Sequence, residues 1–202
     1  MRLFRISTLE HLDDLTGLGA SYQGGGRWNE PGVPALYFAQ AASVAMLEMA
    51  NYLPSPRLVP RNYRLGVFEV DDDIPIDHWT LHEMPDDWRD FPYPKSTQKL
   101  GTDWLIHGQA PLLAVPSTVV PGGLENTVLA SPSRLGTETI HLRSAEADIF
   151  NPRAFSNTEP RIPLEVHAEH SVPSGRIPFH QAASSVSVRG TTSPKGRAHA
   201  QE

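Results

Sequence analysis

The stretch GGGRWNEPGVPAL at residues 24–36 places a cation beside a glycine-rich turn. Glycines let a backbone come close to a ligand, and an arginine fork can pair with two oxygens of a phosphate. Gly25, Gly26 and Arg27 are therefore a candidate anion-binding loop, although a surface arginine in a flexible turn is the simpler interpretation of these residues alone. The stretch is neither a P-loop nor a dinucleotide fingerprint, because no Gly-Lys-Ser/Thr follows and G-x-G-x-x-G is missing.

Glu48 is the one acidic residue in AASVAMLEMA, a predicted helix whose other side chains are nearly all apolar or small. A helix that is apolar on most sides is normally buried, and a buried carboxylate is costly unless it is paired or hydrogen-bonded. Glu48 is therefore a candidate functional acid. On its own, it can equally mark a narrow stripe that faces solvent.

Other polar residues carry weaker signals. Tyr37 lies in the predicted strand ALYFA, where a tyrosine is most often part of the core, and Ser117 follows the predicted strand LLAVP. Ser96-Thr-Gln-Lys99 has the S-x-x-K spacing but lacks its companion motifs, so Ser96 is better interpreted as a helix cap. His78 and His82 lie in a proline-rich stretch that does not favour a helix, and we expect no metal site.

The elements that must position these residues are short. The patterns predict strands at residues 2–6, 35–39, 65–70, 111–115, 127–130 and 139–142. They predict helices from Ser7 to about Gly17, with Ser7 and Glu10 as a capping box, from about Ala41 to Tyr52, and from Ser96 to His107. Residues 17–34 are expected to form a long loop and residues 77–94 an irregular excursion.

Composition restricts the classes of function. A chain of 202 residues suits one well-packed domain, and a net charge of −6 disfavours direct binding to nucleic acid or to an anionic membrane. The absence of cysteine excludes disulfides and thiolate chemistry. Without a signal-like or membrane-spanning apolar run, we expect a cytoplasmic protein. Residues 156–202, rich in Ser, Pro, Arg and His, are expected to be a disordered tail after a domain at residues 1–155.

Three motifs in order resemble one known family. GGGRWNEPGVPALYFAQAASVAMLEM is similar to the signature of RES-domain proteins, which have G-G-R-W-N, then G-x-P-x-L-Y, then a helix with A-x-x-E. TQKLGTDWLIHGQAPLLAVPSTVVPGGLENTVLASP continues the resemblance through a G-x-x-W helix, a V-P-S element and an asparagine. DIFNPRAF resembles the terminal D-P-R-L-F of the family.

The resemblance implies a single α+β domain with a mixed or antiparallel sheet flanked by helices, similar to ADP-ribosyltransferases. RES proteins are typically toxins that consume NAD+ as a substrate, with no prosthetic group. The family's pocket positions match Arg27, Tyr37, Glu48 and Ser117, and Asn126 matches the asparagine after V-P-S. Where the family often has N-x-x-L-N-P, this chain has Ala130-Ser131-Pro132, so its second asparagine is missing.

The implied roles are specific. Glu48 would stabilise the positive charge that grows on the ribose, and Arg27, with Gly25 and Gly26, would hold the phosphates. Tyr37 would stack on nicotinamide or ribose, and Ser117 would hydrogen-bond the amide or a ribose hydroxyl. The implied partner is an Xre-type antitoxin in a hetero-oligomer, which could contain a toxin dimer.

Three functions remain open from the sequence. The first is degradation of NAD+ by a phosphorylase or glycohydrolase reaction, and the second is ADP-ribosyl transfer to a protein. The third is a catalytically inactive module that only binds a partner. The joint presence of Arg27, Tyr37, Glu48 and Ser117 disfavours the third.

Overall fold

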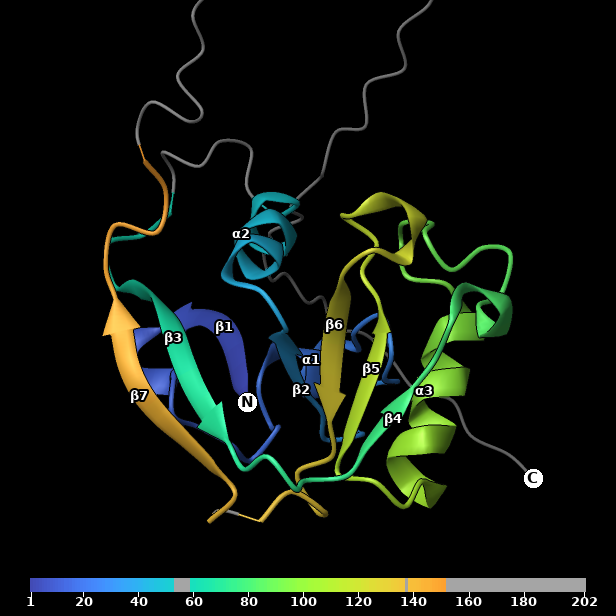
Figure 1. Cartoon of the computed structure of the whole chain (residues 1–202). Helices are drawn as coiled ribbons and strands as arrows, with labels where there is room; N and C mark the ends of the chain where they lie inside the picture. Colours follow the sequence, from blue (N-terminus) through green and yellow to red (C-terminus); the bar gives the residue numbers. More distant parts are fainter. Residues whose placement is uncertain (53–58, 137, 152–202) are drawn as a thin grey trace, which may run out of the picture. The chain divides into compact units, whose positions relative to one another are not determined.

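A seven-stranded mixed sheet with the order β4-β5-β6-β2-β1-β3-β7 forms the scaffold of the described part of the chain (Figure 1). The computed structural model describes residues 1–52, 59–136 and 138–151. The strands are β1 (Arg2–Thr8), β2 (Leu36–Ala39), β3 (Tyr63–Val70), β4 (Ile76–His78), β5 (Leu112–Pro116), β6 (Asn126–Ala130) and β7 (Ile140–Glu146). The helices are α1 (Ala20–Gly24), α2 (Ala42–Ala50) and α3 (Lys95–His107).

The predicted α+β class with a mixed sheet is confirmed. β4 and β5 are parallel, and the other neighbouring strands pair antiparallel. The predicted tail at residues 156–202 lies outside the described residues.

The alternation of apolar residues along the strands places cores on both faces of the sheet. On one face Leu3, Phe38 and Phe68 are buried together, with the rings of Phe38 and Phe68 packed edge to face at 5.2 Å. On the other face Trp104 of α3 packs with Trp28 and residues of β5 and β6. A third cluster packs α2 against β1 and β2.

The pairing of β1 with β2 is the irregular point of this sheet. β1 pairs with β3 over its whole length, from Arg2 to Thr8, and β2 pairs with β6 over its whole length. Between β1 and β2, however, only Phe4 and Ala39 are in register. The sheet therefore consists of two ribbons that meet at one point and diverge from it.

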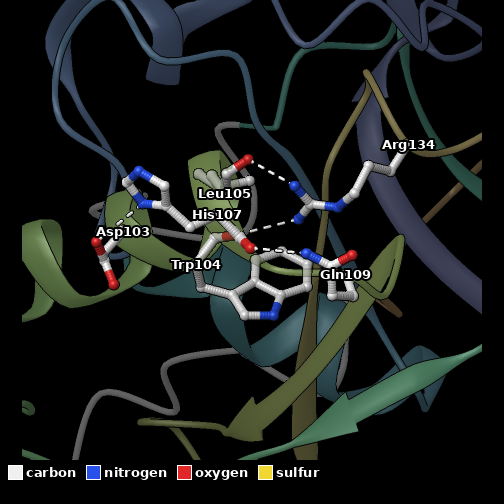
Figure 2. A network of polar contacts seen from close by, with 6 residues as sticks. All are labelled: Asp103, Trp104, Leu105, His107, Gln109 and Arg134. Carbon is white, nitrogen blue, oxygen red and sulfur yellow. Dashed lines mark hydrogen bonds and ion pairs between the residues drawn. The ribbon is translucent and has the colours of Figure 1, made fainter.

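Arg134 anchors the C-terminal end of α3 (Figure 2). Its guanidinium donates hydrogen bonds to the carbonyl oxygens of Leu105 at 2.8 Å, Trp104 at 3.1 Å and Ala110 at 2.9 Å. It also lies 4.7 Å from the centre of the Trp104 ring. The last carbonyls of a helix lack partners within the helix, and a cation complements the negative end of the helix dipole. Arg134 thus satisfies the end of α3 and holds it against the sheet.

We predict that Arg134→Met lowers the free energy of unfolding by about 2 kcal/mol, because three carbonyls lose a charged donor. Urea denaturation followed by circular dichroism measures this change. The matched control is Arg143→Met, whose guanidinium pairs with Glu69 while more than half exposed, so its effect should stay below about 1 kcal/mol. Equal effects of the two substitutions would contradict the anchoring role.

Four local predictions were wrong. The loop predicted at residues 17–34 contains the short helix α1 (Ala20–Gly24). The helix predicted from Ser7 does not form: Ser7 and Thr8 remain in β1, paired with Arg64 and Tyr63, and only a 3-10 turn at Leu9–His11 follows. The excursion predicted at residues 77–94 begins inside β4 (Ile76–His78), which pairs with β5. Ser96 does not cap α3, since Pro94 holds the cap position and the Ser96 hydroxyl donates to the Asp87 carboxylate.

Candidate functional site

A cleft of about 700 Å³ lies where β1 and β2 diverge. Its walls come from β1, β2, α2 and the segment around α1, and they include Glu48, Tyr37 and Thr127. A larger cavity of about 1050 Å³ is lined by residues such as Leu105, Ser131 and Leu135, and by none of the predicted site residues. The smaller cleft is therefore the candidate site.

Glu48 joins α2 to the strands on the far side of this cleft. The Ser117 hydroxyl donates to Glu48 Oε1 at 2.8 Å, and the Thr127 hydroxyl donates to the same oxygen at 3.2 Å. Oε2 has no hydrogen-bond partner in the described part of the chain. Among the described residues, the carboxylate is thus held through Oε1 alone.

Ser117 lies behind Glu48 and not in the wall of the cleft. It is 1% exposed, its hydroxyl donates to Glu48, and the same oxygen accepts the Val119 N–H at 3.4 Å. The structure thus brings Ser117 to Glu48 but not to the surface of the cleft. Its hydroxyl therefore forms hydrogen bonds with Glu48 and Val119 of this chain.

The glycine-rich loop is held by a network centred on Tyr37. The Tyr37 hydroxyl donates to Asn29 Oδ1 at 2.7 Å and accepts the Trp28 N–H at 3.0 Å. Asn29, which is fully buried, donates to the carbonyls of Ser21 at 2.8 Å and Val33 at 3.0 Å. Burial raises the pKa of the Tyr37 hydroxyl far above its ordinary value, although the Trp28 N–H opposes the shift. The hydroxyl therefore stays protonated and acts as a tether.

Gly26 permits this network because it has no side chain. A Cβ at this position would lie 2.5 Å from the Tyr37 hydroxyl oxygen and 2.6 Å from Asn29 Oδ1, closer than real Cβ atoms come. The Gly26 carbonyl accepts a hydrogen bond at 3.0 Å from the side chain of Gln98, a buried residue of α3. The loop is therefore tied to β2 and α3.

Tyr37→Phe should lower the free energy of unfolding by about 1–3 kcal/mol, because the buried Asn29 oxygen and Trp28 N–H lose their shared partner. Chemical denaturation of the variant measures the change. The Tyr22 hydroxyl has no hydrogen-bond partner in the described part of the chain, so Tyr22→Phe should leave the unfolding free energy nearly unchanged. A Tyr37→Phe protein as stable as the wild type would refute the tether.

Arg27 extends from the loop toward the segment before α3. Its Nη1 donates to the carbonyls of Trp88 and Asp90, the latter at 3.1 Å, and its guanidinium lies 5.0 Å from the centre of the Tyr93 ring. Burial raises the pKa of Tyr93, and the charges of Arg27 and Glu48 also affect it, lowering and raising it respectively. Arg27 itself is not among the residues that line the cleft. Arg27 makes no ion pair with a carboxylate among the described residues.

Arg5 is a residue of the cleft that the sequence analysis missed. It lines the cleft from β1, and its Nη1 donates a hydrogen bond to the Asp14 carbonyl at 2.8 Å. Burial lowers the pKa of its guanidinium, against the opposing effect of the Asp14 carboxylate. None of the ion pairs among the described residues includes Arg5. A largely desolvated cation without an ion pair suits an anionic ligand.

The signal for Arg5 was present in the strand RLFRI. Residues two apart on a strand share a face, so Arg5 lies on the same side of β1 as Leu3, which the structure buries. Nearby, Thr8 also lines the cleft, and its hydroxyl is buried without a partner among the described residues. β1 thus contributes two groups to the cleft: the Arg5 cation and the Thr8 hydroxyl, which has no partner among the described residues.

Asn126 and the altered motif lie at opposite ends of β6. The Asn126 side chain donates to Gln40 Oε1 at 3.0 Å, beside the start of α2. At the other end, the Ser131 carbonyl accepts the N–H groups of Arg134 and Leu135 in a turn. The missing second asparagine therefore falls at the end of β6 or in the turn that carries Arg134, and neither Ala130 nor Ser131 lines the cleft.

The comparisons with known proteins identify the family. A model described as the RES domain matches residues 2–147, and the chain therefore belongs to the RES-domain family, as the sequence motifs predicted. DIFNPRAF, at residues 148–155, lies beyond the matched residues.

The match to individual relatives extends over most of the length of each relative. The chain is similar to "Toxin Res" of Yersinia enterocolitica, with 35% identity over 69% of this chain and 89% of that protein. It is also similar to "Prs ADP-ribosylating toxin" of Sphingobium sp., with 34% identity over 70% and 86%. Among solved structures, the M. tuberculosis MbcT–MbcA toxin–antitoxin complex contains a chain with a TM-score of 0.57 and 24% identity, covering 76% of this chain and 85% of that one. This structural match shows that the two chains share a fold.

No helix among the described residues is long and apolar enough to cross a membrane.

Proposed function

We propose that this chain is the toxin of a toxin–antitoxin pair and that it cleaves the nicotinamide–ribose bond of NAD+ in the cleft between β1 and β2. The observation that carries the proposal is the Glu48 carboxylate. It is held through Oε1 by Ser117 and Thr127, and its other oxygen is unpaired among the described residues at the wall of the cleft.

The chemistry follows from the charge that develops during cleavage. The bond between the ribose C1″ and the nicotinamide nitrogen breaks, nicotinamide leaves as a neutral molecule with the electron pair, and the ribose becomes oxocarbenium-like. A nearby carboxylate stabilises this positive charge and can accept a hydrogen bond from a ribose hydroxyl. Water or phosphate then adds to C1″ and, in the case of water, loses a proton. Glu48 Oε2 is suited to the role of the stabilising group.

Two arginines are candidates for binding the diphosphate of NAD+. Arg5 lines the cleft and makes no ion pair with a carboxylate among the described residues, so it is the principal candidate. Arg27 uses Nη1 to hold the carbonyls of Trp88 and Asp90, which leaves its other nitrogens for a second contact. The ring of Tyr37, also in the wall of the cleft, offers a surface for nicotinamide or ribose while its hydroxyl holds the loop.

Glu48→Gln should reduce NAD+ loss by at least about a hundredfold, because the amide removes the charge but retains an oxygen for Ser117 and Thr127. The purified full-length protein is incubated with NAD+, with and without phosphate, and the products are identified by mass spectrometry. The thermal unfolding midpoint of the Glu48→Gln variant should remain close to that of the wild type.

Glu146→Gln, at the exposed end of β7, is the matched control and should retain full turnover. Full turnover by Glu48→Gln would refute the role of this carboxylate. A wild-type protein that neither consumes nor binds NAD+ would instead favour the inactive partner-binding module.

Arg5→Gln should raise the KM for NAD+ by about tenfold or more, because a desolvated cation is lost from the wall of the cleft. Arg143→Gln removes an exposed arginine of β7 and should leave the KM unchanged. An unchanged KM for Arg5→Gln, together with a raised KM for Arg27→Gln, would assign the diphosphate to Arg27 alone.

ADP-ribosyl transfer to a protein is the second candidate, favoured by the name of the Sphingobium relative. It requires the same cleavage, with a protein side chain in place of water or phosphate as the acceptor. Labelled NAD+ separates the two: free ADP-ribose or its 1″-phosphate supports degradation, whereas label retained on a protein supports transfer.

The proposed partner is an Xre-type antitoxin in a hetero-oligomer. The support is the name "Toxin Res" of the Yersinia relative and the toxin–antitoxin complex that contains the structural match. Co-expression with the product of the adjacent reading frame, followed by size-exclusion chromatography, tests whether a stable complex forms.

A further inference from the structure

We infer that Thr127 is a positioning residue for Glu48: its hydroxyl holds one carboxylate oxygen at the wall of the cleft so that the other is presented to the ribose. This inference rests on the proposed cleavage of NAD+. It concerns a residue outside the five positions matched by the sequence motifs, Arg27, Tyr37, Glu48, Ser117 and Asn126.

Glu48 needs external support because of its place in the fold. It is the third residue from the end of α2, a nine-residue helix whose buried residues, Val44 and Ala45, pack beside Ala39 of β2. The side chain of a glutamate has several freely rotating bonds, and fixing them in one arrangement costs conformational entropy. The hydrogen bonds to Oε1 supply the orientation that the helix alone does not.

Thr127 is a rigid donor. It lies in β6, which is paired on both sides, with Ala39 of β2 opposite it in one ladder and Val115 of β5 in the other. A threonine in a strand also has a restricted χ1 angle because it is β-branched. The strand pairing on both sides of β6 and the restricted χ1 angle therefore fix the position of the Thr127 hydroxyl.

Thr127 and Ser117 play different parts in the pair. Ser117 is buried outside the lining of the cleft, and its hydroxyl also accepts the Val119 N–H. Thr127 lines the cleft and is only partly buried. Two donors, Thr127 in β6 and Ser117 directly after β5, converge on Oε1, which limits rotation of the carboxylate about its own axis. Thr127 is the donor on the substrate side.

Thr127→Val tests the inference because it removes the hydroxyl and keeps the β-branched shape. We expect kcat to fall about tenfold, with the KM for NAD+ within about twofold of the wild-type value, since the hydroxyl acts on the reacting carboxylate. Thr127→Ser restores the hydroxyl and should recover at least half of the wild-type kcat. Rates are measured on the full-length protein and corrected for the folded fraction.

Thr139→Val is the matched control, since its hydroxyl donates to the Gly136 carbonyl in an exposed turn. It should leave kcat unchanged. If Thr127→Val does not fold, Thr127→Ala is compared with Thr127→Ser by the same criteria.

The outcomes separate this inference from the proposed function. An active wild type with an unchanged kcat in Thr127→Val, or with no recovery in Thr127→Ser, would overturn the role of Thr127 and leave that of Glu48 intact. A Thr127→Val variant with a raised KM and an unchanged kcat would also overturn the inference, because Thr127 would then act in substrate binding. A wild type without NAD+ turnover would overturn the proposed function, and this inference would fall with it.

Discussion

The limited pairing between β1 and β2 is the constraint on which the site depends. One register contact, Phe4 with Ala39, joins two ribbons that are otherwise fully paired within themselves. Because side chains and not backbone hydrogen bonds fill the space beyond this contact, the sheet opens into a cleft. α2 begins directly after β2 and packs over the junction, which brings Glu48 to the opening. A continuous ladder between β1 and β2 would close it.

Hydrogen bonds to buried polar groups hold the glycine-rich loop in one conformation. Three consecutive glycines have a large conformational entropy to lose, and the Tyr37 hydroxyl, the Asn29 side chain and Gln98 compensate by satisfying loop atoms in the core. The tyrosine that the family resemblance placed in the pocket thus has a structural role through its hydroxyl. Its ring remains available in the cleft.

Much of the fold could be predicted from the sequence, because hydrophobic patterns are local. The strands at β2, β3, β5 and β6 and the helix α3 follow from apolar runs and periodicity. The capping box at Ser7 was wrong because pairing with Arg64 of β3 is stronger than a local helix signal. β4 was missed because a three-residue strand is stabilised by β5 and not by its own sequence.

The sequence by itself determined the family and the order of the residues that could do chemistry, since Arg27, Tyr37, Glu48 and Ser117 lie in motifs short enough to be recognised locally. Only the tertiary structure decided where these side chains lie relative to one another and to the cleft. It attached Ser117 and Thr127 to one oxygen of Glu48 and brought Arg5 to the same cleft from β1. Residues as far apart as Arg5, Glu48 and Thr127 meet through strand pairing, and no local pattern encodes a contact between distant segments.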